Sequence, residues 1–131
     1  MEPTETSIAL LVVEDNDPTR RLIRHWLQND FDLSIADRFD TALRLAGDRD
    51  FDLFILDINL GQESNGVDLL KEIRRFPRYL NTPAIAFTAY ALPQDRERLI
   101  EQGFDNYLCK PFTRDSLYKS ITQTLQSQRI A

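Results

Sequence analysis

Short apolar runs alternate with segments of helical periodicity along the whole chain. Five apolar runs bounded by polar residues predict strands at residues 8–13, 31–36, 51–57, 84–89 and 105–110. Between and after them, apolar residues recur every three or four positions, which predicts five helices. Their apolar stripes are Ile23, Trp26 and Leu27; Phe39, Ala42, Leu43 and Ala46; Val67, Leu70 and Ile73; Leu99 and Ile100; and Leu117, Ile121 and Leu125.

Local signals predict where these helices begin and end. Asp17–Pro18 is typical of an N-cap followed by a proline in the first turn, and this first helix should run to about Gln28. Gly47 and Gly103 are expected to close the second and fourth helices. The third helix should end before Pro77, the fourth opens at Pro93, and Thr113 is a suitable cap for the last.

Alternating strands and helices predict an α/β fold built on a parallel sheet, with helices on both faces. Strands covered on both faces are apolar throughout, as residues 8–13 and 53–56 are. Right-handed crossovers leave few topologies, so we expect a (βα)5 doubly wound sheet of five parallel strands in the order 2-1-3-4-5, the flavodoxin-like arrangement.

The length of 131 residues, with 42% hydrophobic and 28% charged residues, fits one globular domain. We expect residues 1–7 to be a flexible N-terminal segment, 8–128 the domain, and 129–131 a short tail. The net charge of −5 argues against direct nucleic-acid binding, which needs a basic surface. The single cysteine, Cys109, cannot form an internal disulfide.

The start of the chain lacks the basic residues and long apolar run of a signal peptide. No apolar stretch approaches the roughly 20 residues needed to span a bilayer. We therefore expect a cytoplasmic protein that does not bind membranes.

Polar residues gather where the predicted strands end. Glu14 and Asp15 follow the first strand, Asp57 ends the third, and Thr88 and Lys110 end the fourth and fifth. Ligands of doubly wound sheets bind outside the carboxyl ends of the strands, at the point where strand order reverses. The sequence therefore predicts a site with three carboxylates, one hydroxyl and one ammonium.

Three neighbouring carboxylates repel one another, so either their pKa values rise or a cation joins them. Oxygen ligands without Cys or His select a hard ion such as Mg²⁺. Lys110 adds a charge suited to phosphate, and Thr88 can hydrogen-bond a phosphoryl oxygen. Asp57, beside a divalent cation and a lysine, is a plausible phosphoryl acceptor.

Taken together, these residues resemble the receiver domain of two-component response regulators, the CheY-like family. The resemblance runs from Ile8 to about Gln126. Five motifs carry it, in order and at the family's separations: "VVEDN" (12–16), "LFILDINL" (53–60), "NGVDLL" (65–70), "AFTAY" (86–90) and "YLCKPF" (107–112). Any one of them is weak evidence, but the ordered set is specific.

The resemblance implies roles for the residues at the strand ends. Asp57 is similar to the aspartate that takes a phosphoryl group from a partner's phosphohistidine. Glu14 and Asp15 resemble the pair that holds Mg²⁺ (or Mn²⁺), together with Asp57 and the backbone carbonyl of Asn59. Lys110 resembles the lysine that contacts this carboxylate and then the phosphoryl group.

Further roles follow from the same resemblance. Thr88 and Tyr107 correspond to the family's switch residues, and Ala89 offers a backbone N–H to phosphate. Asn59 and Tyr90 occupy the positions that tune how fast water removes the phosphoryl group. The Lys110–Pro111 bond is expected to be cis.

The resemblance also implies partners. We expect phosphorylation by a histidine kinase or phosphotransfer protein, and a downstream protein at the face of the fourth helix, fifth strand and fifth helix. We expect a monomer or weak dimer, and a switch that assists its own phosphorylation and dephosphorylation without being an enzyme in the ordinary sense. The loop "INLGQESNG" departs from the family, which places a Met–Pro pair after the aspartate and a glycine one residue earlier than Gly66. We expect a single-domain regulator, or a piece of something larger.

Several alternatives stay open on the sequence. The domain could be the receiver of a hybrid histidine kinase, passing its phosphoryl group on to a histidine. An aspartyl-nucleophile phosphatase would want a second acid where Asn59 stands, and a flavin carrier would want a Ser/Thr-rich loop where "EDNDPTR" stands. His25 is interpreted as a helix-surface residue, and Cys109 as a small packing residue.

Overall fold

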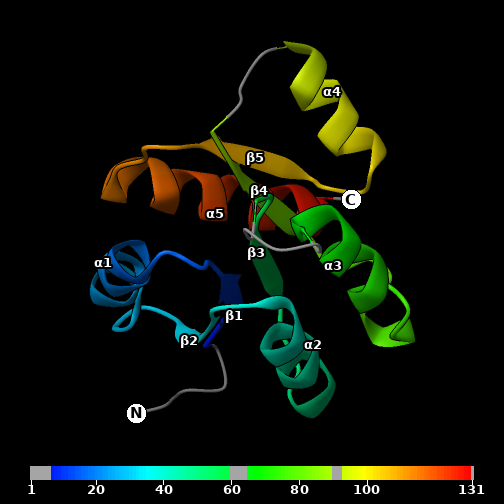
Figure 1. Ribbon diagram of the computed structural model, residues 1–131, viewed down its shortest axis with the longest axis horizontal. Helices are drawn as coiled ribbons and strands as arrows, with labels where there is room; N and C mark the ends of the chain where they lie inside the picture. The colour runs from blue at the N-terminus through cyan, green and yellow to red at the C-terminus, as the bar shows by residue number, and fades with distance from the viewer. Residues whose placement is uncertain (1–6, 60–64, 90–92, 131) are drawn as a thin grey trace.

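Five parallel strands form the central sheet of the computed structural model, which describes residues 7–59, 65–89 and 93–130 (Figure 1). The strands are β1 (Ala9–Val13), β2 (Asp32–Ala36), β3 (Leu53–Asp57), β4 (Ala84–Thr88) and β5 (Asn106–Cys109). Their order is β2-β1-β3-β4-β5, and every neighbouring pair is parallel. The predicted doubly wound topology is confirmed.

Helices cover both faces of this sheet (Figure 1). They are α1 (Asp17–Leu27), α2 (Phe39–Asp48), α3 (Gly66–Ile73), α4 (Pro93–Glu101) and α5 (Arg114–Ile130), with a short 3-10 helix, η2 (Pro77–Tyr79). α1 and α5 pack on one face, and α2, α3 and α4 on the other. The α5 helix continues through Gln128 to Ile130.

The apolar runs of the strands divide between these two faces. In β3, Leu53 and Ile55 pack towards α1 and α5, whereas Phe54 and Leu56 pack towards α2 and α3. All four are fully buried, and each such side chain stabilises the fold by about 1.5–3 kcal/mol. The last residue of β3, Asp57, is its only polar one, and its carboxylate needs polar partners that these apolar neighbours cannot supply.

The strand register brings the predicted site residues to one edge. Asp57 lies opposite Phe87, and Thr88 lies opposite Cys109. The Lys110 amide continues the ladder by donating to the carbonyl of Thr88 at 2.8 Å. Asp57, Thr88 and Lys110 therefore leave three adjacent strands within about one residue of the same level.

The cap of α1 differs from the prediction. Asn16, rather than Asp17, is the N-cap: its backbone is extended and its Oδ1 accepts from the Thr19 amide at 2.9 Å. Asp17 is the first helical residue and pairs with Arg21 at 2.8 Å. Two adjacent residues could both act as caps, and Asn16 takes the position because Asp17 and Pro18 both fit the first turn.

The end of α2 also differs from the prediction, because Gly47 lies inside the helix. The terminal carbonyls are satisfied by side chains from η2, so no left-handed glycine is needed. The Tyr79 hydroxyl donates to the Ala46 carbonyl at 2.7 Å, and Arg78 Nη2 donates to the carbonyls of Ala46 and Gly47 at 2.6 and 3.1 Å. Gly103, in contrast, has φ of 108° and closes α4 as expected.

The prediction that Ile100 belongs to the core is wrong. The apolar pattern predicts that Ile100 faces inward with Leu99, but 56% of its surface is exposed, whereas Leu99 is buried. Successive helical residues point about 100° apart, so Ile100 points away from the direction of Leu99. Among the described residues of α4, Leu99 is the one that belongs to the buried core cluster. Trp26 and Leu125 are only partly buried.

Candidate functional site

An open cleft of about 400 Å³ lies at the carboxyl ends of β1, β3, β4 and β5. Its lining contains most of the predicted site residues, brought together from four separate loops. The lining residues are Glu14, Asp15, Asn16, Thr19, Asp57, Ile58, Asn59, Thr88, Ala89 and Lys110. The polar strand ends therefore meet in one place, as the topology requires.

Lys110 connects the two buried acids of this cleft. Its Nζ donates to Asp57 Oδ2 at 2.8 Å and lies 2.9 Å from Glu14 Oε1. Glu14 is 0% exposed and Asp57 is 3% exposed, so both carboxylates have lost most of their water. A single ammonium thus serves two buried carboxylates that come from different strands.

Glu14 is the fully buried acid of this pair. Its Oε2 accepts from the Asn16 amide at 3.1 Å, and its Oε1 has the ion pair with Lys110 as its contact. Burial raises the pKa of Glu14 to about 7, and the charge of Asp57 adds to that rise, while Lys110 opposes it. The two buried acids share the single charge of Lys110, so a further cation near Glu14 would offset the remaining negative charge.

Lys110 remains an ammonium in this environment. Burial lowers its pKa, but the hydrogen bond to Asp57 and the charge of Glu14 raise it by more, so the pKa of Lys110 lies above its ordinary value. The cleft therefore contains one fixed positive charge among its acids at neutral pH.

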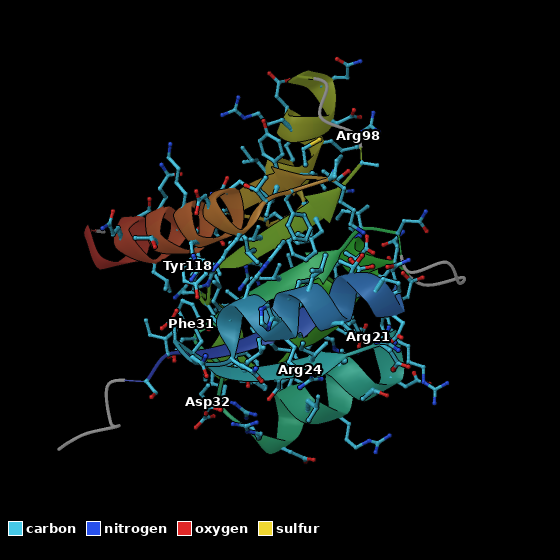
Figure 2. All side chains as sticks on the ribbon, turned by 90° about the vertical axis from the view of Figure 1, so that its left-hand side faces the viewer. Arg21, Arg24, Phe31, Asp32, Arg98 and Tyr118 are labelled. Carbon is cyan, nitrogen blue, oxygen red and sulfur yellow. The ribbon has the colours of Figure 1, made fainter. Side chains whose placement is uncertain are left out.

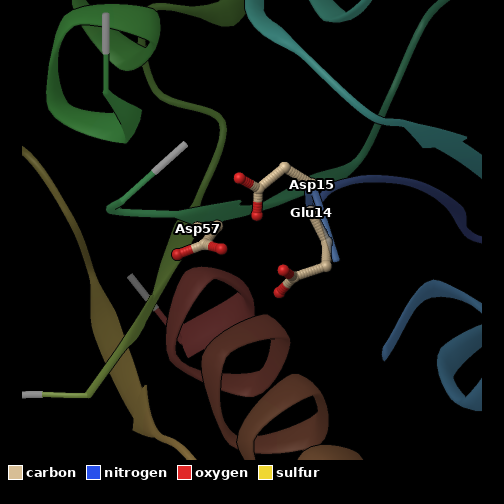
Figure 3. Close-up of side chains that lie close together, drawn as sticks. All are labelled: Glu14, Asp15 and Asp57. Atoms are coloured by element: carbon tan, nitrogen blue, oxygen red, sulfur yellow. The ribbon is translucent and has the colours of Figure 1, made fainter. Parts of the chain in front are cut away.

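Asp15 completes a cluster of three acids. One carboxylate oxygen from each of Glu14, Asp15 and Asp57 lies within 4.8 Å of the other two (Figure 3). It is the only group of three or more His, Cys, Asp or Glu side chains with metal-binding spacing among the residues that the structure describes. Three oxygen donors with net negative charge fit a hard divalent cation such as Mg²⁺.

The loop after β3 contributes backbone groups to the cleft. The Asn59 amide donates to Asp57 Oδ1 at 3.0 Å, which fixes one oxygen of the carboxylate while Lys110 holds the other. Gly66 closes this loop against the strand, and its amide donates to the Ile58 carbonyl at 3.1 Å. A Cβ on Gly66 would lie 2.4 Å from the Asp57 carbonyl oxygen, so only glycine fits.

The other predicted residues fall into two groups. Thr88 is buried at the end of β4 and lines the cleft with the exposed Ala89. Tyr107 is partly buried on β5, outside the cleft lining, with the Arg96 guanidinium 5.4 Å from its ring centroid. Tyr90 lies outside the described residues, as does the 60–64 part of the loop that departs from the family pattern.

Three smaller expectations can be compared directly. The Lys110–Pro111 peptide bond is cis, as expected. His25 is exposed on α1, in agreement with its interpretation as a surface residue. Cys109 is half-buried, and its Sγ lies 3.5 Å from the Lys110 carbonyl oxygen.

Sequence reasoning missed three contributors to this site. Asn16 and Thr19 line the cleft, and their hydroxyl–amide contact of 2.7 Å joins the start of α1 to the loop after β1. The pattern Asn–Asp–Pro could have indicated the Asn16 cap. The close approach of Gly66 to Asp57 left no local signal, because it depends on how α3 meets β3.

Comparison with known proteins places this fold and cleft in a family. A sequence model described as the response regulator receiver domain matches residues 10–122. The chain therefore belongs to the receiver domain family of two-component response regulators. Receiver domains are signalling modules that bind Mg²⁺ through acidic residues and interact with histidine kinases and downstream effectors.

Individual relatives are similar along most of this chain. An "Uncharacterized 14.6 kDa protein in sodA1 3'region" from Leptolyngbya boryana is 32% identical over 121 residues, covering 92% of each chain. The signal transduction histidine-protein kinase BarA of Escherichia coli (strain K12) is 27% identical over 121 residues, covering 92% of this chain but only 13% of BarA. The chain thus corresponds to a small part of that kinase.

A solved structure also resembles the chain closely. It is the receiver domain of the sensor histidine kinase PA1611 from Pseudomonas aeruginosa PAO1, with a magnesium ion coordinated in its active site cleft. It is 29% identical, has a TM-score of 0.81, and covers 92% of this chain and 99% of that one.

None of the helices formed by the described residues combines the length and hydropathy needed to cross a bilayer.

Proposed function

We propose that this domain is a Mg²⁺-dependent phospho-acceptor in which Asp57 takes a phosphoryl group from the phosphohistidine of a histidine kinase or phosphotransfer protein. The observation that carries this proposal is the Lys110 ammonium, paired with both Asp57 and Glu14 in a cleft that Asp15 also lines. The magnesium ion in the receiver domain of PA1611 supports it by similarity.

The transfer is a simple displacement. An Asp57 oxygen attacks phosphorus, the bond between phosphorus and the partner's imidazole nitrogen breaks, and the imidazole leaves with that electron pair. The product is an aspartyl phosphate. Such reactions depend on positioning and on neutralising the charge of the phosphoryl oxygens, rather than on acid–base groups of the acceptor.

The residues of this chain divide that work. Glu14, Asp15, Asp57 and the backbone carbonyl of Asn59 would hold the cation, which can be Mg²⁺ or Mn²⁺. When bound, the cation supplies charge neutralisation for the incoming phosphoryl group. The Asn59 amide, by donating to one oxygen of Asp57, orients the carboxylate so that its reacting oxygen is fixed.

The remaining cleft residues act on the phosphoryl oxygens. The Lys110 ammonium, released from part of its pairing with Asp57, contacts one oxygen, while the Thr88 hydroxyl and the Ala89 amide donate to others. These roles are supported by the positions of Lys110, Thr88 and Ala89, which all line the cleft. Asn59 and Tyr90 would control how easily water reaches the aspartyl phosphate.

Phosphorylation would switch a surface away from the cleft. Thr88 moves towards the phosphoryl group, Tyr107 turns inward, and the face of α4, β5 and α5 changes its affinity for a downstream protein. We propose a cytoplasmic, monomeric or weakly dimeric domain with no direct contact to nucleic acid or membrane.

A second form of the same function uses the domain as a relay. Its similarity to part of BarA favours a receiver within a hybrid histidine kinase, which would pass the phosphoryl group from Asp57 on to another histidine. The similarity over 92% of the Leptolyngbya boryana protein favours a stand-alone regulator instead. An aspartyl-nucleophile phosphatase is disfavoured because Asn59 stands where the second acid would be needed.

The proposal is tested by phosphoryl incorporation from acetyl phosphate in the presence and absence of Mg²⁺. Wild-type protein should label only with Mg²⁺, and Asp57→Asn should not label. Asp52→Asn is a matched control, because Asp52 precedes the same strand at its opposite end. Undiminished labelling of Asp57→Asn would falsify the assignment of the acceptor.

A further inference from the structure

Arg20 reaches from the first helix back to the loop that presents two of the acids. Its Nη1 donates to the backbone carbonyl of Glu14 at 2.9 Å, and its Nη2 donates to Asp17 Oδ1 at 3.0 Å. The side chain is 21% exposed, so most of it lies against the protein. Arg20 itself does not line the cleft.

The Glu14 carbonyl belongs to the peptide unit that joins Glu14 to Asp15. A peptide unit is planar, so fixing its oxygen fixes the direction in which the chain enters Asp15. The preceding amide of Glu14 is already held by the Ala36 carbonyl at 3.0 Å. The bond from Arg20 therefore completes the fixation of the backbone between the two acids.

The two acids differ in how their side chains are held. The Glu14 carboxylate has the Asn16 amide and Lys110 as partners, and burial surrounds it. Asp15 is exposed, yet its carboxylate lies within 4.8 Å of those of Glu14 and Asp57. Asp15 thus depends more than Glu14 on its backbone for its place in the cluster.

We propose that Arg20 is a positioning residue for the divalent cation: through the Glu14–Asp15 peptide it holds the acidic pair in the arrangement that binds metal. This inference rests on the proposed Mg²⁺ site. Residues that orient metal ligands from outside the ligand set commonly affect metal affinity tenfold or more.

Arg21 provides a matched control on the same helix. It also pairs with Asp17, at 2.8 Å, but it is 80% exposed (Figure 2). Loss of Arg21 should therefore disturb the Asp17 pair and the charge of α1 without releasing the Glu14–Asp15 peptide. A difference between the two arginine variants isolates the contact with the backbone carbonyl.

The test is calorimetric titration of the purified domain with MgCl₂, with thermal unfolding in EDTA to check that each variant folds. We expect Arg20→Ala to raise the Kd for Mg²⁺ about tenfold and Arg21→Ala to change it by less than about twofold. Arg20→Lys should recover part of the loss, because an ammonium can donate to the carbonyl but lacks the second fork of the guanidinium. At saturating Mg²⁺ the labelling rate of Arg20→Ala from acetyl phosphate should approach that of the wild type.

Unchanged Mg²⁺ affinity in Arg20→Ala, or an equal loss in Arg21→Ala, would overturn the inference while leaving the phospho-acceptor proposal intact. A wild-type domain that binds no Mg²⁺ would overturn both. If Arg20→Ala does not fold, Arg20→Gln takes its place, since a shorter amide keeps polarity at the site but cannot span the same distance. Wild-type affinity in that variant contradicts the inference equally.

Discussion

The two edges of the sheet use acidic residues in opposite ways. At the amino edge, Asp52 precedes β3 and accepts from the Ala9 amide at 2.8 Å, and Asp105 precedes β5 and accepts from the Ala84 amide at 2.9 Å. Asp105 also lies 3.8 Å from Arg74. At the carboxyl edge, Glu14 and Asp57 are more deeply buried and share one lysine.

The difference follows from the polarity of parallel strands. Backbone N–H groups are left over where strands begin, and these can donate to a carboxylate. Backbone carbonyl groups are left without a sheet partner where strands end, and these groups repel a carboxylate. Acids at the carboxyl edge therefore depend on Lys110, on the few amides of their loops, and on a cation. The same residue type stabilises the fold at one edge and prepares a binding site at the other.

The largest expected contrast is between the cations of the two edges. Lys110→Ala should lower the rate of Mg²⁺-dependent labelling about 100-fold, because loss of one group that stabilises charge in a transition state has effects of this size. Arg74→Ala should leave the rate per folded molecule unchanged, since Arg74 donates to the Tyr79 and Gly103 carbonyls and none of these three residues lines the cleft. Single-turnover labelling with acetyl phosphate measures the rates of both variants. Equal rates for Lys110→Ala and Arg74→Ala would contradict the assignment of Lys110 to phosphoryl transfer.

The next contrast concerns stability at the amino edge. Asp105→Ala should lower the free energy of unfolding by about 2 kcal/mol, because the Ala84 amide loses a charged acceptor and Arg74 loses the carboxylate 3.8 Å away. Asp105→Asn keeps an acceptor and should lose less. Urea unfolding measures the difference, and a neutral or stabilising effect of Asp105→Ala would show that this acid has no structural role.

A third prediction concerns pH at the carboxyl edge. The pKa of Glu14 rises from 4.5 to about 7 on folding, so between these values the folded chain holds a proton that the unfolded chain has lost. Without metal, the contribution of Glu14 to stability should therefore increase as pH falls from about 7 towards 4.5.

Metal binding should show the opposite trend, because Mg²⁺ requires the ionised carboxylate. Its association constant should fall by up to about tenfold per pH unit below the Glu14 pKa, and should level off above it. Calorimetric titration with MgCl₂ over a pH series measures the slope. Asp15→Asn should weaken binding at every pH but keep the slope, and a slope of zero in the wild type would show that Glu14 does not couple to the metal.

The smallest effect expected is a stabilisation. In EDTA, Asp57→Ala should raise the free energy of unfolding by about 1 kcal/mol, because it removes a buried charge that repels Glu14 while Lys110 keeps Glu14 as its partner. Mg²⁺ should raise the stability of the wild type and not that of the variant. A midpoint that is unchanged or lower for Asp57→Ala would argue against a crowded carboxylate site.

Much of the fold and of the cleft could be predicted because the sequence signals lie within each strand or directly after it. Each buried strand is an apolar run, and the first polar residue after it, as at Asp57 or Lys110, lies at the edge where ligands bind. Periodicity located the strands, the right-handed crossover rule gave the sheet order, and the strand ends then predicted the cleft.

The errors arose where tertiary contacts decide between local options. Gly47 looks like a helix stop, but Arg78 and Tyr79 cap that helix from elsewhere in the chain. Ile100 is apolar and next to the buried Leu99, but the rim position of α4 leaves it exposed. Neither outcome could be read from neighbouring residues alone.

The most direct test of the central claim is to map the phosphorylated residue chemically. Borohydride reduces an aspartyl phosphate to homoserine, so the domain is labelled with acetyl phosphate and Mg²⁺, reduced, digested and sequenced by mass spectrometry. The account predicts homoserine at position 57, and none when Mg²⁺ is omitted. Homoserine at another aspartate, or its absence after stable phosphoryl incorporation, would contradict it.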